Sequence, residues 1–202
     1  MGINEDKLVV EALIAEGDAD FKICDKLKTK EWDDTRIVET LSEVWDDDRL
    51  VVALSEEWDD DRRVVVAVNR IWADVWIIAT LSEVWDDDRR VIEALSEVWA
   101  DDRRLVAALS EVWEDDRRVA VALNKIWYDE RIIATLSIFW ADDRRVVSAL
   151  DEVWENDRRL IKILSEVWAD DRLVVKALSE TWSESRIVQA FRRPIGENRN
   201  NR

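Results

Sequence analysis

Runs of aspartate are the residues of this chain with the most evident chemistry. Three successive carboxylates stand at residues 46–48 and again at residues 86–88, and carboxylate oxygens are the ligands that Ca²⁺ prefers. Both runs lack the alternating Asp and the turn glycine of an EF-hand loop, and both are followed directly by Arg. Two interpretations stay open: the aspartates cap helices and pair with Arg of neighbouring repeats, which we favour, or they bind cations weakly.

Other reactive groups are scarce. The chain has no His and three Gly, so it lacks both the commonest general base and a glycine-rich phosphate loop. Its single cysteine, Cys24, has no histidine to activate it, and we expect a buried core thiol. The carboxylates are so numerous that no pair of them stands out as a catalytic acid and base. We therefore expect a protein that is not an enzyme, with no catalytic, cofactor-binding or metal-binding residues.

Four residues are candidates for contact with a partner: Trp76, Val75, Tyr128 and Phe139. Trp76 takes a repeat position that Arg89 and Arg131 hold elsewhere, and Val75 takes an Asp position, so a charged face becomes apolar there. Tyr128 and Phe139 lie in the same sector one longer period further on. Either this segment packs against another turn of the chain or it binds a partner, since exposed aromatic residues mark interfaces.

These residues belong to a sequence that repeats every 13 or 14 residues. Trp marks the repeat at positions 32, 45, 58, 72, 85, 99, 113, 127, 140, 154, 168 and 182. Such a period predicts stacked units that share one core. We expect each Trp to be a buried wedge between helices, with its N–H bonded to the Asp of the next repeat.

One repeat has the pattern of an amphipathic helix. In the repeat that ends at Trp99, the apolar residues share one side of a helical wheel and the charged residues share the other. The apolar side consists of Val91, Ile92, Ala94, Leu95, Val98 and Trp99. The breadth of this side lets the helix pack against two neighbours.

Helix starts are predicted at the aspartates. Asp87 or Asp88 is a good N-cap, because a carboxylate there accepts from unpaired N–H groups and suits the helix dipole. The position of Asp87 is filled by residues 34, 47, 60, 74, 101, 115, 129, 142, 156, 170 and 184. In one continuous coiled coil, Asp102 and its equivalents would lie in the buried seam at high cost. We therefore expect 14 short helices of about ten residues.

The expected organisation is a single repeat array over residues 1–195. Residues 1–32 are atypical N-terminal repeats, with Phe21, Cys24 and Leu27 as the apolar side of the second, and residues 33–182 are regular. Residues 183–195 form a C-terminal cap. Residues 196–202 read as a disordered tail.

A longer period of 55 residues is also present, as from Trp72 to Trp127. It is either the trace of a four-repeat duplication or a sign that helix i stacks on helix i+4. Near-identical neighbouring repeats, unlike the alternating helices of paired-helix arrays, predict one helix per repeat.

The charge balance narrows the partners. A net charge of −17 and a pI near 4.5 argue against nucleic acid and anionic membranes. No apolar run is long enough for a transmembrane helix, and the N-terminus lacks a signal-peptide pattern. We expect a cytoplasmic monomer or weak homo-oligomer.

Trp-ended, Asp-opened units such as residues 95–104 resemble those of short helical tandem repeat proteins, a group of bacterial α-solenoids with one short helix per unit. The resemblance covers about residues 33–182 and is HEAT-like only in the wider sense. It implies an all-α, compact solenoid, near-closed into a ring or toroid-like disc, and implies no activity.

The expected function is therefore a non-catalytic scaffold that binds an unidentified protein partner, an analogy from the fold. The alternative is a binder of cations or small ligands through the acidic turns or a central channel.

Overall fold

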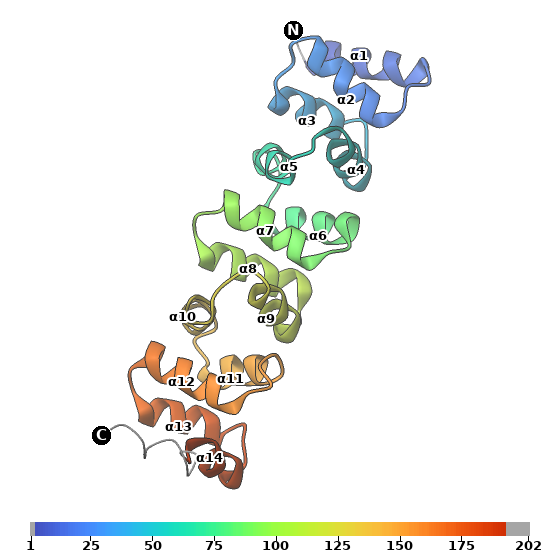
Figure 1. Cartoon of the computed structure of the whole chain (residues 1–202). Helices are drawn as coiled ribbons and strands as arrows, with labels where there is room; N and C mark the ends of the chain where they lie inside the picture. Colours follow the sequence, from blue (N-terminus) through green and yellow to red (C-terminus); the bar gives the residue numbers. More distant parts are fainter. Residues whose placement is uncertain (1–2, 193–202) are drawn as a thin grey trace, which may run out of the picture. The chain divides into compact units, whose positions relative to one another are not determined.

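The computed structural model describes residues 3–192, and these residues form fourteen α-helices and no strand (Figure 1). The predicted all-α class and the predicted number of short helices are confirmed for this part of the chain. The helices are α1 Ile3–Ala15, α2 Asp20–Thr29, α3 Asp34–Ser42, α4 Asp47–Glu57, α5 Asp61–Val68, α6 Asp74–Trp85, α7 Asp88–Val98, α8 Asp102–Trp113, α9 Asp116–Asn124, α10 Asp129–Trp140, α11 Asp143–Asp151, α12 Asp157–Trp168, α13 Asp171–Ser179 and α14 Glu184–Phe191.

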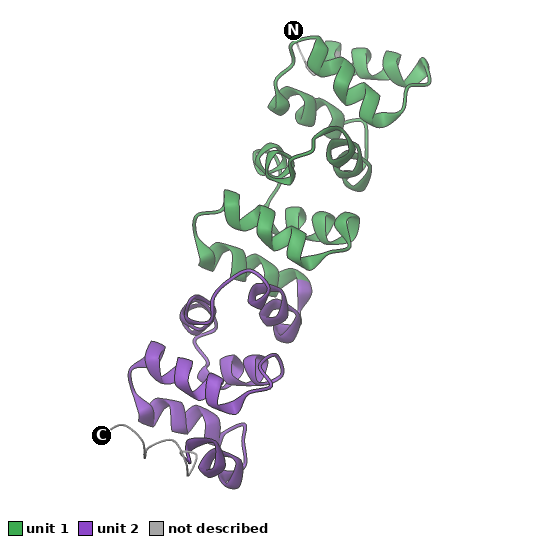
Figure 2. Cartoon of the chain, viewed as in Figure 1, with its two compact units in different colours: residues 1–112 green, residues 113–202 purple. Residues whose placement is uncertain are grey.

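The helices are grouped in two compact units, residues 1–112 and 113–202 (Figure 2). In the first unit α1, α3, α5 and α7 pack one on the next, and α2, α4 and α6 do the same beside them. In the second unit α9, α11 and α13 form one stack, and α10, α12 and α14 form the other. Each unit is therefore a solenoid-like stack in which a helix packs on the second helix along the chain.

This packing tests one of the two interpretations of the 55-residue period. The prediction that helix i stacks on helix i+4 is wrong, because within each unit the stacking partner is helix i+2. The physical reason is that every turn between repeats sends the chain across to the other stack, so two repeats bring it back. Each regular repeat forms a single helix as predicted. The predicted contrast with paired-helix arrays is wrong, because within each unit consecutive helices alternate between two stacks.

The core is built from the same four repeat positions in most of the described helices. In α7 these are Val91, Ile92, Ala94 and Leu95, which are all buried, while Val98 is only half-buried. Burying a Val, Ile or Leu side chain contributes about 1.5–3 kcal/mol. Because the isolated helices are too short to persist in water, this shared core is what stabilises them.

Helix N-caps show two kinds of turn between repeats. In one kind the cap follows the Trp directly, as Asp33 follows Trp32. In the other kind one residue intervenes, as before Asp60 and Asp87, and that residue is left-handed at several turns, for example Asp86 with φ 49°. The backbone N–H of Arg89 donates to Asp87 Oδ1 at 2.9 Å, so the carboxylate satisfies an otherwise unpaired donor.

The two kinds of turn correct the predicted caps. The position of Asp87 is the side-chain cap at residues 60, 115, 142, 156 and 170, and Asp101 also accepts from the backbone N–H of Arg103. It is wrong by one residue at 34, 47, 74, 129 and 184, where the cap is the preceding residue. The preceding residue is Asp33, Asp46, Ala73, Tyr128 and Ser183, respectively.

The N-terminal repeats follow the general plan with a shift. After α1, Gly17 adopts φ +82°, a left-handed conformation that glycine tolerates. In α2 the buried residues are Ile23, Cys24 and Leu27, whereas Phe21, predicted on the apolar side, is 36% exposed. Of the predicted cap 183–195, the structure describes the part through residue 192, and the predicted tail 196–202 lies outside the described residues.

No helix in the described part of the chain combines the length and the apolar character that a bilayer crossing requires.

Candidate functional site

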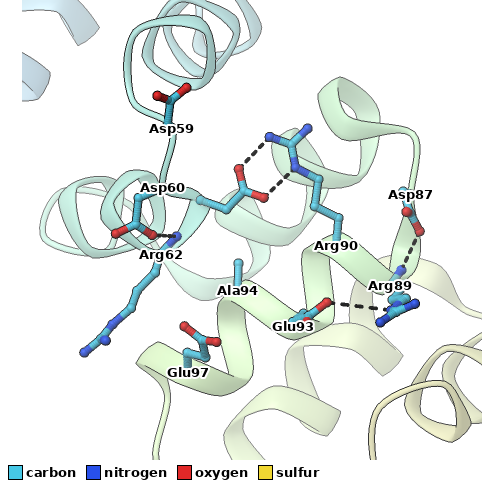
Figure 3. Close-up of a pocket in the computed structure, with 10 residues that line it drawn as sticks. Asp59, Asp60, Arg62, Asp87, Arg89, Arg90, Glu93, Ala94 and Glu97 are labelled. Atoms are coloured by element: carbon cyan, nitrogen blue, oxygen red, sulfur yellow. Dashed lines mark hydrogen bonds and ion pairs between the residues drawn. The ribbon is translucent and has the colours of Figure 1, made fainter.

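The candidate site is best understood from a contact that recurs along the array. Arg90, in the first turn of α7, lies over the ring of Trp85 with its guanidinium carbon 4.4 Å from the ring centroid. Its Nε and Nη2 donate to the two carboxylate oxygens of Asp61 at 2.6 and 2.5 Å, and Figure 3 shows these hydrogen bonds as the two dashed lines from Arg90. We call this set of Arg, Trp and Asp an arginine clamp.

Every clamp has the same composition. The Arg lies in the first turn of one helix, the Trp ends the preceding repeat, and the Asp lies in the first turn of the helix two repeats earlier. Within the two units such Arg–Asp pairs have N–O distances between 2.5 and 3.0 Å and join Arg36 to Asp6, Arg49 to Asp20, Arg63 to Asp34, Arg90 to Asp61, Arg104 to Asp74, Arg145 to Asp116, Arg159 to Asp129 and Arg186 to Asp157.

The clamp arginines also cover the tryptophan rings. Their guanidinium carbons lie 3.9–4.8 Å from the ring centroids of Trp32, Trp45, Trp58, Trp85, Trp99, Trp113, Trp127, Trp140, Trp154 and Trp182. A cation over an indole face is attracted by about 0.5–2 kcal/mol. All ten of these rings are buried, so the clamp joins a helix to its stacking partner and also keeps water from the edge of the core.

The clamp changes the acidity of its aspartates. Hydrogen bonds from Arg63 lower the pKa of Asp34, and hydrogen bonds from Arg104 lower the pKa of Asp74, because a positive partner favours the ionised carboxylate. Burial acts in the opposite direction at both residues and is the smaller effect.

Two expectations about these contacts are corrected. Pairing of Asp with Arg is confirmed, but it joins repeats two apart, because those are the repeats that stack. The tryptophan N–H does not bond to the Asp of the next repeat where the partner is described. Trp85 donates to Ser55 and Trp99 donates to Asn69, each at 2.9 Å and each two repeats earlier.

Trp76 interrupts the series of clamps. Its counterpart one repeat further on is Arg90, since Asp61 and Arg90 are separated by the same 29 residues as Asp47 and Trp76. The comparison of Trp76 with Arg89 was therefore wrong by one residue. The Trp76 side chain lies in the first turn of α6 and is 62% exposed, so it does not replace Arg as a buried cover.

The two groups that a clamp arginine would contact at this place also differ from their counterparts. Trp72, which ends the preceding repeat, is half-buried rather than buried. Asp47, in the first turn of α4, has its pKa raised by burial first and then by the neighbouring carboxylates Asp48 and Asp46. Helices α4 and α6 pack on each other, so Asp47 takes the place of a clamp aspartate, while the clamp position in α6 holds Trp76 and not Arg.

A second interruption occurs in the other unit. Leu173 takes the clamp position above Trp168, and Trp168 is likewise half-buried. Here the Asp that belongs to the clamp position, Asp143, lines one pocket together with Lys176. An aliphatic side chain and a nearby ammonium group therefore stand where Trp76 and Ala79 stand in α6.

The other predicted contact residues lie in different places. Val75 is half-buried beside Trp76. Tyr128 is 66% exposed at the start of α10, and Phe139 is 37% exposed near its end. Trp76 and these two residues belong to different units.

Sequence reasoning missed Ile138, which is 64% exposed next to Phe139. The sequence did contain a signal for it, because Ile138 takes the repeat position that the polar Glu97 holds in α7.

Several aspartates of the two runs have roles within the fold. Asp46 and Asp87 cap helices, and Asp88 also has an interaction partner. In the described part of the chain, no three His, Cys, Asp or Glu residues gather in a way that would hold a metal ion. Carboxylates occupied by backbone N–H groups are poor cation ligands.

Cys24 is the remaining reactive side chain. It is fully buried in α2, and burial raises the pKa of its thiol to about 12. A thiol of that acidity stays protonated near neutral pH, and the thiolate is the nucleophilic form. The buried position agrees with the expected core role.

Comparison with known proteins found no match. No family model, no curated protein and no solved structure matches the chain.

Proposed function

We propose that this chain is a non-catalytic repeat scaffold that binds another protein, with Trp76 at the centre of its contact surface. The observation that carries the proposal is the exposure of Trp76, 62%, at a repeat position that holds Arg in most of the regular repeats. Indole rings contribute strongly to protein interfaces, and tryptophan is among the residues most enriched in their energetic centres.

The structure bears on the competing interpretation of Trp76, in which the residue packs against another turn of the chain. Within its unit, the neighbouring buried side chains of α6 are Ile77 and Ile78, while Trp76 extends into water. An apolar side chain left in water favours association with a partner, since burial of its surface lowers the free energy.

A further group of exposed apolar side chains on α10 supports a role in binding. Ile138 and Phe139 are adjacent, and both are exposed. Because exposed apolar residues that cluster mark interaction sites, we assign these two residues and Tyr128 to a separate contact. The acidic charge of −17 favours a partner with a basic surface over nucleic acid. The cytoplasmic setting and the monomeric or weakly associated state stay predictions.

The proposal is tested with Trp76→Arg and a matched control. Purified wild-type protein captures partners from a lysate of its own cells, and the captured proteins are identified and then repurified. We expect Trp76→Arg to lose at least one of these partners and Leu8→Arg to retain it, because Leu8 is 64% exposed and gains the same charge. Equal affinity of the repurified partners for all three proteins would discard Trp76 as the contact.

The cation-binding alternative has no specific observation in its favour, given the roles of the aspartates. Calorimetry with Ca²⁺ is the direct experiment. Heat of binding with a raised melting temperature would restore this alternative.

A further inference from the structure

The array itself shows what the surroundings of Trp76 are suited to bind. At each clamp, one guanidinium contacts an indole ring on its face and a carboxylate at its edge. This arrangement satisfies both features of the group, because a planar cation stacks on an aromatic face while its N–H groups bind a carboxylate in pairs. At Trp76 the chain keeps the ring and the carboxylate but supplies no arginine of its own.

We propose that Trp72, Trp76 and Asp47 form a docking site for an arginine side chain of a partner protein. The incoming guanidinium binds the Asp47 carboxylate and the indole face of Trp72, as Arg90 binds Asp61 and Trp85. Trp76 adds a second indole beside it. This proposal rests on the proposed function, since it names the chemistry of the partner that Trp76 contacts.

Charge and solvation around Asp47 support this occupant. Asp46, Asp47 and Asp48 are consecutive, and the first side chain caps α4 while the other two have no basic partner in the described structure. The raised pKa of Asp47 arises from burial and from the two neighbouring carboxylates. A guanidinium relieves both causes, because it replaces lost water contacts and offsets the negative charge.

The second interruption of the series is a useful contrast. Leu173 offers no aromatic face, and Lys176 already lies in the same pocket as Asp143. An arginine there would meet an ammonium group of like charge. The docking site is therefore assigned to the surroundings of Trp76 and not to those of Leu173.

The test is a titration of the full-length chain with a short peptide, acetyl-Gly-Arg-Gly-amide, followed by NMR of the indole N–H groups. Trp72→Phe and Trp76→Phe assign the two relevant resonances. We expect saturable shifts at Trp72 and Trp76. The same peptide with citrulline, a neutral isostere of arginine, is expected to bind at least about tenfold more weakly, because charge-assisted bonds are stronger than neutral ones.

Variants of the chain give the matched comparison. Asp47→Asn is expected to weaken the arginine peptide at least about tenfold, whereas Asp48→Asn, with the same loss of charge one residue away, changes affinity by less than about threefold because screening weakens indirect contributions. Trp76→Arg is expected to abolish binding, because its own side chain completes the clamp. A melting curve of each variant confirms that it is folded.

Several results would overturn the proposal. The proposal fails if the citrulline peptide, or the same peptide with lysine in place of arginine, binds as tightly as the arginine peptide. It also fails if Trp76→Arg binds the arginine peptide with unchanged affinity. Shifts spread over many indole N–H groups, or no binding of the arginine peptide at all, would overturn it as well. If the peptide fails but Trp76→Arg still loses a protein partner, the arginine site is wrong and the scaffold function stands. If the peptide binds at Trp72 and Trp76 but protein partners are retained by Trp76→Arg, the arginine chemistry is right and Trp76 is discarded as the contact with those partners.

Discussion

The first turns of α6 and α7 both begin with Asp but differ in the two residues that follow, and they end with different surfaces. In α7, Arg90 covers Trp85, bonds to Asp61 and leaves the ring 7% exposed. In α6, Trp76 extends into water, and Trp72 remains half-buried. Both helices bury the same four core positions, so the core does not explain the difference.

The contrast separates two tasks within one repeat. Burial of Ile, Leu, Val and Ala holds each helix in its stack, and any repeat with that pattern can do this. The clamp lies at the rim of the core, where exchange of one residue changes the surface but leaves the stack in place. A repeat array can therefore gain a binding site at a single position without a new fold.

Removal of the ring from each region should have the largest effect. Trp85→Ala is expected to lower the free energy of unfolding by about 3–5 kcal/mol, because it empties a buried site and leaves Ser55 without its indole donor. Trp72→Ala is expected to cost about 1–3 kcal/mol, since part of the ring is already in water. Urea unfolding followed by circular dichroism measures both, and equal losses would show that the clamp does not shield the ring.

Removal of the covering side chain should have an intermediate effect. Arg90→Ala is expected to cost about 1–2 kcal/mol, because it removes a two-point bond to Asp61 and the contact with Trp85. The value is reduced by solvent screening, since the two charged side chains are 39% and 32% exposed. Trp76→Ala is expected to change stability by less than about 0.5 kcal/mol. A loss as large as that of Arg90→Ala would mean that Trp76 is a structural residue.

Conversion of one region into the other is the next test. Trp76→Arg is expected to raise the free energy of unfolding by about 0.5–1 kcal/mol by forming a clamp with Asp47 and Trp72. In an Asp47→Asn background, about half of this gain should disappear, as a double-mutant cycle in urea would measure. An identical gain in both backgrounds would mean that Asp47 is not the carboxylate partner of the side chain at residue 76.

The pH dependence should distinguish the two kinds of aspartate, with the smallest effect. Asp34 has its pKa lowered from 3.8 by Arg63, so its stabilisation is present above pH 3.8 and is lost as pH falls through the lower folded value. Asp47 has a raised pKa, so the native state binds its proton first, and the destabilisation by this group fades as pH falls through the raised value. Asp34→Asn should therefore flatten the loss of stability between pH 5 and pH 2, roughly the range in which carboxylates titrate, and Asp47→Asn should steepen it.

The measurement is a series of urea unfolding curves over that pH range. Asp48→Asn serves as the control, because it removes the same charge from the neighbouring carboxylate. Identical slopes for the Asp34 and Asp47 variants would contradict the assignment of different surroundings to the two residues.

Part of the candidate site could be foreseen from the sequence and part could not. Trp76 was identified because an indole in an Arg position departs from the local repeat, and the departure is visible without a fold. Its companions, Trp72 and Asp47, were not identified, because each is ordinary for its own repeat. Only the packing of α6 on α4 makes Asp47 a neighbour. Ile138 was missed although its position is polar in other repeats.

The predicted caps show the same limit on a smaller scale. Adjacent aspartates such as Asp33 and Asp34 have the same side chain, yet the first caps α3 and the second bonds to Arg63. The choice depends on whether a residue intervenes between the Trp and the cap, which backbone geometry decides. The near-closed disc implied by the family resemblance stays a prediction, and small-angle scattering is the measurement that tests it.

The sequence by itself determined the short helices, their number and their buried faces, because helical periodicity and capping act over distances of a few residues. The tertiary structure decided which repeats stack and hence which Arg, Trp and Asp meet, because contacts 29 or 30 residues apart depend on the path of the chain through two turns. The Trp85 ring is covered and the Trp72 ring is partly open. This difference therefore depends on residues that are distant in the sequence and become neighbours only in the fold.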